Sequence, residues 1–354
     1  MSMDPKISQL VETSKNVIMG CCLENGAIVA ANTDKPEYPK NANNYRFVWP
    51  RDVSFILYAA NIIGINEIQK PFIAWMMERA EDFSESGMIF QRYSTNGLRD
   101  TEFGHQYQPD QAGSLLWSLS EICNEPDEKF EKIISLLADG LCRNWDRQNF
   151  VIPTHDLWEE RSTFPKLNDN FSYTLAACSH GLELAYKSSG NEEWLKVSNE
   201  MRNLLQRFGK DHYPRVEGRI PDKRIDASIL GLVWPFNSVG IDKKLLNSIE
   251  MLKKKLMTPE GIKRYENDEY DSTIENLNHW KKGGGGWPLL TFWYVIALAK
   301  TNHIEEAKIL FDDYIKHFRY YIPEQMFNNK IQVSVSPMCW SHAMFIIAAR
   351  ELVL

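Results

Sequence analysis

Residues 110–146, DQAGSLLWSLSEICNEPDEKFEKIISLLADGLCRNWD, decide the fold. Apolar residues recur at i, i+3 and i+4 on both sides of a short break at 124–126, so the stretch predicts helices over 110–124 and 127–146. Asp127 stands where an N-cap is expected, and acidic residues follow it in the first turn. The stretch is therefore one helical hairpin with a tight turn.

The same unit recurs along the whole chain. Further helices are predicted near 4–17, 51–64, 66–83, 169–188, 191–208, 225–236, 242–256, 287–300, 303–319 and 338–352. Asn191 is an N-cap candidate like Asp127. Links such as Ser188-Ser189-Gly190 are tight, whereas each link that enters a helix starting near 51, 110, 169, 225, 287 or 338 is long, aromatic and charged.

The alternation of short and long links predicts the architecture. Helices separated by one hairpin point the same way, so all six long links emerge at one end of a ring of inner helices. We therefore predict an all-α fold, an (α/α)6 barrel, in a single domain over residues 1–354, with its chemistry on one rim. Short β-branched pieces at 26–31, 87–93 and 330–335 are typical of small hairpins in the loops.

Composition excludes several classes of function. Forty Lys and Arg against 47 Asp and Glu give a net charge of −7, so no basic field is available to bind DNA or RNA. The chain has no apolar run of the ~18 to 20 residues that a membrane span requires, and its start, MSMDPKISQL, lacks the features of a signal peptide. We expect a cytoplasmic protein. Its six cysteines, without CxxC spacing, are typical of reduced thiols.

Neither a metal nor an organic cofactor is expected. His155, His180 and His342 lack the spacing of metal ligands, so core or hydrogen-bonding roles are favoured. No Lys-Ser/Thr pair follows the glycines at 283–286, so a nucleotide loop is excluded. The acidic segment 266–271 lacks the EF-hand pattern and leaves only a weak calcium alternative.

The rim links share one chemical character, a Trp or Tyr beside carboxylates and Arg. Such a set is typical of a sugar pocket, because aromatic rings cover the C–H face of a sugar and charged groups bind its hydroxyls. Two carboxylates on facing loops are also what glycoside hydrolysis requires. The segments are YRFVWPRD (45–52), DLWEER (156–161), RY (264–265), GGGGWP (283–288) and YIPEQ (321–325).

These motifs, in this order from about Asn44 to the C-terminus, resemble glycoside hydrolase family 15, the glucoamylase, glucodextranase and trehalase-like group. The resemblance implies an inverting α-glucosidase that releases β-glucose from the nonreducing end. It implies that Glu159 is the general acid and Glu324 the general base. It places Arg51 and Asp52 on the hydroxyls of the terminal glucose, and Tyr45 near the scissile bond. The remaining sugar-binding candidates are Trp49, Trp158, Glu160, Arg264 and Trp287.

Several alternatives remain open from the residues themselves. Either Glu159 or Glu160 could have the raised pKa of an acid. Arg51 and Asp52 could form an internal ion pair, and Glu324 could be an exposed surface residue. Asp110 and Asp226 are read as helix caps. The tryptophans inside helices, Trp75, Trp117 and Trp293 among them, are read as packing residues.

The substrate is a small carbohydrate, whose linkage residue types alone do not define. Family members often carry a β-sandwich or a starch-binding domain, for which this length leaves no room. We therefore expect isomaltose, maltooligosaccharides or similar α-glucosides. The alternatives are a trehalase-type α,α-1,1 hydrolase, a lyase on the same barrel, and a noncatalytic glucan-binding or regulatory barrel. The oligomeric state is not predicted.

Overall fold

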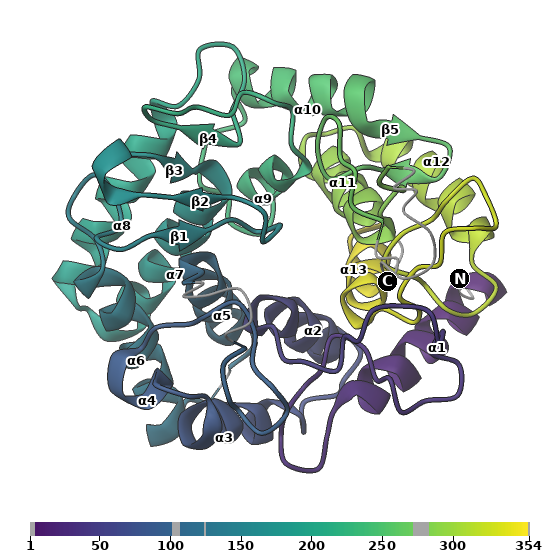
Figure 1. The fold of residues 1–354 in the computed structure, drawn as a ribbon, viewed down its shortest axis with the longest axis horizontal. Coiled ribbons are helices and arrows are strands. Elements are labelled where there is room, and N and C mark those ends of the chain that lie inside the picture. The colour runs from purple at the N-terminus through teal and green to yellow at the C-terminus, as the bar shows by residue number, and fades with distance from the viewer. Residues whose placement is uncertain (1–3, 101–106, 124, 272–282, 353–354) are drawn as a thin grey trace.

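The computed structural model describes residues 4–100, 107–123, 125–271 and 283–352; Asn124, in the predicted turn of the opening hairpin, lies outside them. Their helices form a ring of two layers (Figure 1). Each inner helix contacts the next, and α13 contacts α2, so the inner ring is closed. The inner helices are α2 (Pro50–Ile62), α5 (Pro109–Ile122), α7 (Ser172–Ser189), α9 (Leu230–Val233), α11 (Pro288–Lys300) and α13 (Cys339–Leu352).

The outer layer follows the predicted alternation. It consists of α1 (Pro5–Cys21), α3 (Gln69–Arg79), α6 (Glu128–Arg143), α8 (Glu192–Gln206), α10 (Lys243–Leu256) and α12 (Ile304–Tyr314). Short turns of helix add α4 (Phe83–Ser86) and the 3₁₀ segments η1 (Pro165–Leu167), η2 (Ala227–Ile229) and η3 (Ile315–His317). The predicted (α/α)6 barrel is confirmed.

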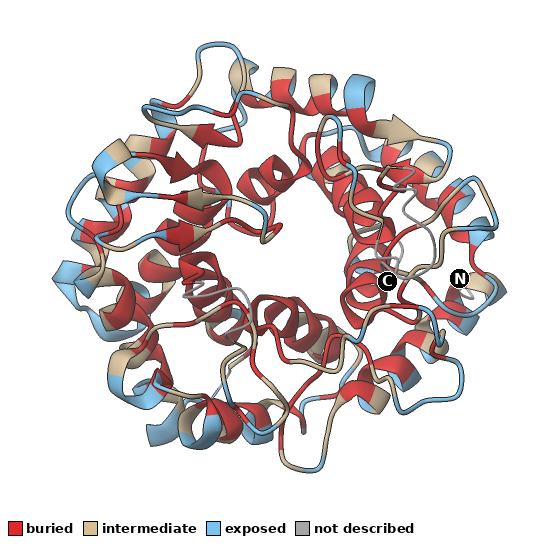
Figure 2. Ribbon diagram, viewed as in Figure 1, coloured by how far each residue is buried: buried red, intermediate tan, exposed pale blue. Residues whose placement is uncertain are grey.

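The two layers differ in burial, as Figure 2 shows. In α11 every residue from Pro288 to Leu298 is buried, because the helix lies between its ring neighbours and an outer helix. In α6 only one stripe is buried, formed by Ile133, Ile134, Leu137 and Leu141 among others. Within the described ranges no helix has both the length and the apolar character needed to cross a bilayer.

Local signals set the helix starts. Pro50, Pro109 and Pro288 each begin an inner helix, where proline fixes φ and the missing N–H has no helical partner to lose. The predicted caps Asp127 and Asn191 are confirmed: Asp127 accepts from the backbone N–H of Phe130 at 3.0 Å, and Asn191 from that of Glu193 at 3.1 Å.

Helices α5 and α7 approach closely at two glycines. A Cβ on Gly113 would lie 2.4 Å from the carbonyl carbon of Ala177, and a Cβ on Gly181 would lie 2.6 Å from the carbonyl oxygen of Gly113. Only glycine permits this backbone contact. It fixes the relative position of the two helices that follow the rim links ending at Gln108 and Phe171.

Some predicted elements are shorter or lie elsewhere. The helix predicted over 225–236 ends at Val233, because Trp234 is extended and Pro235 has no N–H to continue it. The helix predicted over 66–83 divides into α3 and α4, separated by Asp82 with φ +64°.

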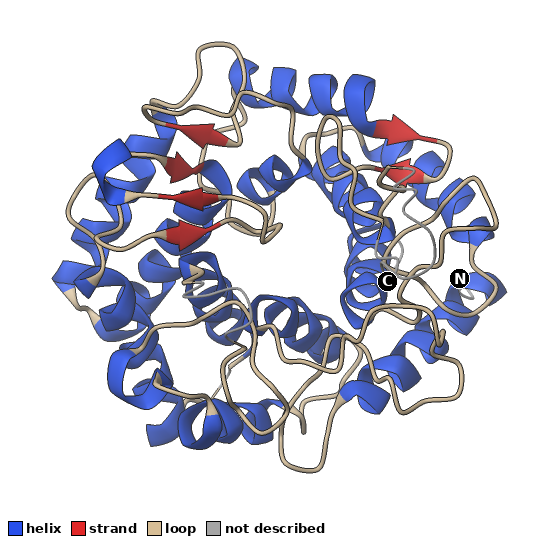
Figure 3. Ribbon diagram, in the orientation of Figure 1, coloured by secondary structure: helices blue, strands red, loops and turns tan. Residues whose placement is uncertain are grey.

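The predicted hairpins at 26–31, 87–93 and 330–335 were wrong, because the described residues there form no strand. Ile28 and Phe90 each make one isolated bridge, and Tyr93 makes two. The strands that do form are two residues long and lie in other rim links (Figure 3). They are β1 (Thr154–His155) with β2 (Ser162–Thr163), β3 (Asn170–Phe171) with β4 (Val216–Glu217), and β5 (Met257–Thr258) with β6 (Gly261–Ile262).

An aromatic cluster fills the centre of the ring. The ring of Phe55 on α2 lies 5.2 Å from Trp117, 5.3 Å from Trp293 and 5.1 Å from Trp340, measured between centroids. Trp75, Trp117 and Trp293 are buried, which confirms them as packing residues. These aromatic side chains fill the space between the inner helices. Trp340 belongs to this cluster and also lines the rim pocket.

Candidate active site

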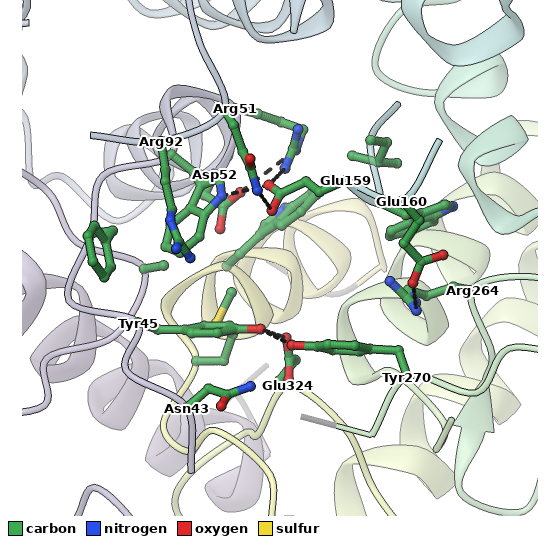
Figure 4. A pocket seen from close by; sticks show the side chains of 18 of the residues that line it. Asn43, Tyr45, Arg51, Asp52, Arg92, Glu159, Glu160, Arg264, Tyr270 and Glu324 are labelled. Carbon is green, nitrogen blue, oxygen red and sulfur yellow. Dashed lines mark hydrogen bonds and ion pairs between the residues drawn. The ribbon is translucent and has the colours of Figure 1, made fainter. Parts of the chain in front are cut away.

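A cavity of about 780 Å³ opens at the rim where the long links converge. Figure 4 shows the side chains that line it, drawn from segments far apart in the sequence. The structure brings all ten predicted site residues to this one pocket: Tyr45, Trp49, Arg51, Asp52, Trp158, Glu159, Glu160, Arg264, Trp287 and Glu324.

Arg51 and Asp52 lie in the first turn of α2 and are buried. One Arg51 nitrogen, Nη1, lies 3.1 Å from Gln108 Oε1 and 3.2 Å from Asp110 Oδ2, while Nη2 lies 3.5 Å from Glu159 Oε1. Arg51 Nε is 3.8 Å from Asp52 Oδ1. An internal ion pair therefore exists, and both of its members also line the pocket.

Asp110 is not a cap, contrary to the prediction. It lies inside the first turn of α5, whose N-cap position is held by Gln108, and its carboxylate pairs with Arg51. Burial raises the pKa of Asp110 to about 6, although the Arg51 guanidinium opposes this shift.

The carboxyl group of Asp52 has a strongly raised pKa. Burial raises its pKa to about 7; Arg51 opposes the shift, and the nearby Glu159 and Glu324 carboxylates add to it. Within the described part of the chain, five buried atoms of pocket residues make no hydrogen bond: Arg51 Nε, Asp52 Oδ1, His155 Nδ1, Trp287 Nε1 and Trp340 Nε1. Such atoms in a pocket are suited to a polar ligand.

Glu159 is held in an unusual backbone conformation. Its φ of +63° is in the left-handed region, which costs a non-glycine residue about 1 kcal/mol or more. Its Oε1 accepts from Trp49 Nε1 at 2.6 Å, and its Oε2 accepts from the amide of Gln91. Burial raises the pKa of Glu159, while Arg51, Gln91 and Trp49 oppose the rise.

Glu160 has different partners. Its Oε1 lies 2.6 Å from Arg264 Nη2, its Oε2 accepts from the hydroxyl of Tyr265, and Arg215 Nη2 is 3.9 Å away. Arg264 is in turn held by both oxygens of Asp268, at 2.7 and 2.9 Å. Glu160 is thus one member of a charged cluster, whereas Glu159 is bound mainly by neutral donors.

Asp268 is the partner of Arg264, which argues against the calcium alternative for residues 266–271. Glu266 likewise accepts from the backbone N–H of Ile225 at 2.9 Å and pairs with Lys255 at 3.2 Å. In the described ranges no three His, Cys, Asp or Glu side chains are grouped so that they could hold a metal ion.

A buried ion-pair network supports the loop that carries Glu159. Trp158 Nε1 donates to both oxygens of Asp226 at 3.0 Å. Asp226 also caps η2 through the backbone N–H of Ser228, which confirms that it is a cap. Arg215 pairs with Asp156 and lies 3.3 Å from Asp226. No motif marks Arg215 in the sequence.

Glu324 is only 2% exposed, so the alternative of a surface residue is wrong. Tyr45 Oη donates to its Oε1 at 2.8 Å and lies 2.5 Å from Tyr270 Oη. The backbone N–H of Glu324 donates to the carbonyl of Val335 at 2.8 Å. Figure 4 shows Glu159 and Glu324 on opposite sides of the pocket.

Sequence reasoning missed several residues that line the pocket: Asn43, Gln91, Arg92, His155, Tyr270 and Trp340. Arg92 lies over the rings of Phe47 and Trp49, 4.5 and 5.3 Å from their centroids, and pairs with Asp100. Trp340 could have been found, because it begins an inner helix after a long link as Arg51 does. Gln91 and Arg92 lie in the segment 87–93, which was interpreted as a small hairpin, so they were not considered as pocket residues.

A toroid of helical hairpins with paired carboxylates, arginines and tryptophans in one rim pocket is the arrangement typical of helical-barrel glycoside hydrolases. Residues 16–334 match the family described as Glycosyl hydrolases family 15, and the chain belongs to this family. This membership is what the motifs predicted.

Three curated relatives illustrate the range of this similarity. An uncharacterized glycosyl hydrolase of Methanocaldococcus jannaschii is 29% identical over 98% of this chain and 56% of its own length. A trehalase of Mycobacterium tuberculosis is 22% identical over 80% of this chain and 45% of its own. An isomaltose glucohydrolase of Kribbella flavida is 24% identical over 78% and 72%, respectively. The chain thus spans about half the length of the first two.

A solved glycosidase variant in complex with glucose has the same fold, with a TM-score of 0.78 and 22% identity over 99% of both chains. A bacterial glucoamylase complexed with acarbose has a TM-score of 0.68 and 18% identity, over 97% of this chain and 55% of that one.

Proposed function

We propose that this protein is an exo-acting glycosidase that hydrolyses small α-glucosides with inversion, with Glu159 as general acid and Glu324 as general base. One observation carries the proposal: two buried or partly buried carboxyl groups face each other across one pocket, in different surroundings (Figure 4). Burial raises the pKa of Glu159, as a resting acid requires. Glu324 accepts a hydrogen bond from Tyr45, which orients its carboxyl group.

The pocket floor suits the nonreducing terminal glucose. Asp52 and Arg51 both line the pocket, and a carboxylate beside a guanidinium suits a pair of vicinal hydroxyls. The faces of Trp49, Trp158 and Trp287 supply apolar walls for the C–H surface of the sugar. Glu160 and Arg264 complete the binding set.

The reaction then follows from these positions. Glu159 gives its proton to the glycosidic oxygen as the bond from that oxygen to C1 breaks, and the aglycone leaves as an alcohol. Glu324 takes a proton from a water molecule whose oxygen attacks C1 from the opposite face. The product is β-glucose. Glu159 ends ionised and Glu324 protonated, and proton exchange with solvent restores both.

The proposed substrates are isomaltose, maltooligosaccharides and similar small glucosides, cleaved by residues 1–354 acting as one catalytic domain. The closed aromatic floor supports an exo mode, because a chain can enter only by its end. Trehalose is the second candidate, since relatives that match 80% of this chain are named trehalases.

The test is a panel of isomaltose, maltose, maltotriose and trehalose, with free glucose as the readout. We expect glucose from at least one of them, and none from the Glu324→Gln variant with an unchanged melting temperature. Cleavage of trehalose alone would select the second candidate. A folded protein that releases glucose from no member of the panel would contradict the proposal, and so would full activity in Glu324→Gln.

A further inference from the structure

The segment that leads into Glu324 is bound by the first turn of α13. The hydroxyl of Ser341 donates to the carbonyl of Pro323 at 2.8 Å, and the backbone N–H of Ile322 donates to His342 Nε2 at 2.9 Å. The N–H of Met338 also donates to the carbonyl of Ile322 at 3.0 Å. Two residues before the proposed base, the backbone is therefore anchored to an inner helix.

The hydrogen bonds of His342 define its tautomer. Because Nε2 accepts from Ile322, the ring proton of the neutral imidazole is on Nδ1, which donates to Ser14 Oγ at 2.8 Å. His342 and Ser14 are both buried. Burial lowers the pKa of His342 to about 3, so the ring remains neutral and keeps its acceptor.

We propose that His342 is a positioning residue for Glu324, held in its accepting tautomer by Ser14 of α1. This inference rests on the proposed function, since it assumes that Glu324 is the base. The path is short: Ser14 orients His342, His342 binds the amide of Ile322, and the backbone continues through Pro323 to Glu324. Helix α1 of the outer ring thereby acts on the reaction through α13 without contacting the substrate.

The expected effect is on geometry rather than on affinity. The residues proposed to bind glucose come from other links, Arg51 and Asp52 from α2 and Glu160 from the 156–161 loop, so they stay in place when Ile322 is released. A displaced carboxylate would activate water poorly, and a shift of about 1 Å can cost about 100-fold in rate. The affected quantity is therefore kcat, with KM nearly unchanged.

Two substitutions of the same residue separate positioning from packing. The amide oxygen of His342→Gln can reach the place of Nε2 and accept from Ile322. His342→Asn is shorter and can reach Ser14 but not Ile322. We expect kcat of the Gln variant to be within about 3-fold of wild type and that of the Asn variant to fall about 10- to 100-fold, each with KM within a factor of about two.

The choice of substrate identifies which catalytic group is affected. α-Glucosyl fluoride has a leaving group that needs no proton from an acid, yet it still needs a base to activate water. We expect His342→Asn to be slow on both α-glucosyl fluoride and an α-glucoside, as Glu324→Gln is. Glu159→Gln should recover activity on the fluoride, and it is the matched control.

Several results would overturn the inference. These are a folded His342→Asn variant with the kcat of wild type, equal losses in the Asn and Gln variants with equal falls in melting temperature, or a rise in KM with unchanged kcat. If neither variant folds, Ser14→Ala decides: a lower kcat at constant KM supports the inference, and an unchanged kcat overturns it. Full activity of Glu324→Gln would instead show that the proposed function itself is wrong.

Discussion

Glu159 and Glu160 are adjacent in the sequence, but the closest partner of each is of a different kind. Glu159 accepts from the indole of Trp49 at 2.6 Å, and Glu160 lies 2.6 Å from the guanidinium of Arg264. The positive φ of Glu159 sends the two side chains to different walls of the pocket (Figure 4). This contrast gives a physical reason to assign the acid to Glu159, which residue types alone did not.

The first prediction compares the two neighbours. Glu159→Gln cannot supply a proton, so we expect kcat for an α-glucoside to fall by about two to four orders of magnitude while the melting temperature stays near that of wild type. Glu160→Gln breaks the pair with Arg264, and we expect its main effect to be a raised KM. Steady-state kinetics of both variants check this. Near-normal kcat in Glu159→Gln together with an inactive Glu160→Gln would show that Glu160, not Glu159, is the general acid.

The second prediction concerns the alkaline side of the pH profile. Glu159 must be protonated to act, and burial raises its pKa, so kcat should fall as the pH rises through that raised value. The residual rate of Glu159→Gln should lack this alkaline limb, because the titrating group is gone. The measurement is kcat against pH for both proteins on α-glucosyl fluoride and on an α-glucoside. An identical alkaline limb in the variant would assign it to another group.

The third prediction uses Asp52, whose pKa is raised to about 7 by burial. The folded protein holds the proton more tightly than the unfolded chain, so the Asp52 contribution to the free energy of unfolding decreases as the pH rises from about 4 to about 7. Asp52→Asn has no charge to bury. At pH 8 we expect it to be about 1 to 3 kcal/mol more stable than wild type, and at pH 4 equal to it.

Denaturant unfolding at both pH values tests the effect of Asp52. Substrate binding by the same variant should weaken, because one charged acceptor oxygen is replaced by an amide donor. This trade of stability for function is common at binding sites. A variant that is less stable than wild type at pH 8 would show that the pairing with Arg51 outweighs the cost of burial.

The ring of helices could be predicted from the sequence because capping residues and prolines mark the helix starts locally. Asp127 and Asn191 cap helices as expected, and Pro50, Pro109 and Pro288 begin inner helices near their predicted starts. The length of helix α9 was overestimated, because the apolar residues at 232–236 continue past Pro235, which stops the helix. The strands were misplaced because two-residue pairings depend on which loops meet, not on β propensity.

The pocket was predicted as far as its motifs extend. Residues such as Tyr270 and Arg92 lie in irregular links, where no periodicity indicates the direction of a side chain. The role of Asp110 was missed because its partner Arg51 is 59 residues away in the sequence. The same limit applies to Arg215, which meets Asp156 only through the fold.

The fourth prediction separates two tyrosines near Glu324. Tyr45 donates to Glu324, so in this chain of hydroxyls Tyr270 is the donor to Tyr45. We expect Tyr45→Phe to lower kcat about 10-fold or more, because the carboxylate loses a direct partner, and Tyr270→Phe to lower it less. Kinetics of the two single variants and the double variant check the order. A larger loss in Tyr270→Phe would indicate that Tyr270 binds the substrate directly.

The last prediction is the stereochemical outcome, which distinguishes the proposed mechanism from a covalent one. Inverting enzymes separate their carboxyl groups by about 6.5 to 9.5 Å to admit water, and retaining enzymes by about 5 to 5.5 Å. Glu159 follows Trp158 before α7, and Glu324 precedes α13; these two helices are not neighbours in the inner ring, and the side chains face each other across the pocket (Figure 4).

We therefore expect proton NMR of the early reaction to show β-glucose first, with α-glucose growing only at the rate of mutarotation. The control is the same measurement on authentic β-glucose in the same buffer, which gives the mutarotation rate. Early α-glucose would exclude water activation by Glu324, because retention requires that a carboxylate attack the anomeric carbon and form a glycosyl-enzyme intermediate. In that case Glu324→Gln should also fail to accumulate such an intermediate on α-glucosyl fluoride, since its amide is a poor nucleophile.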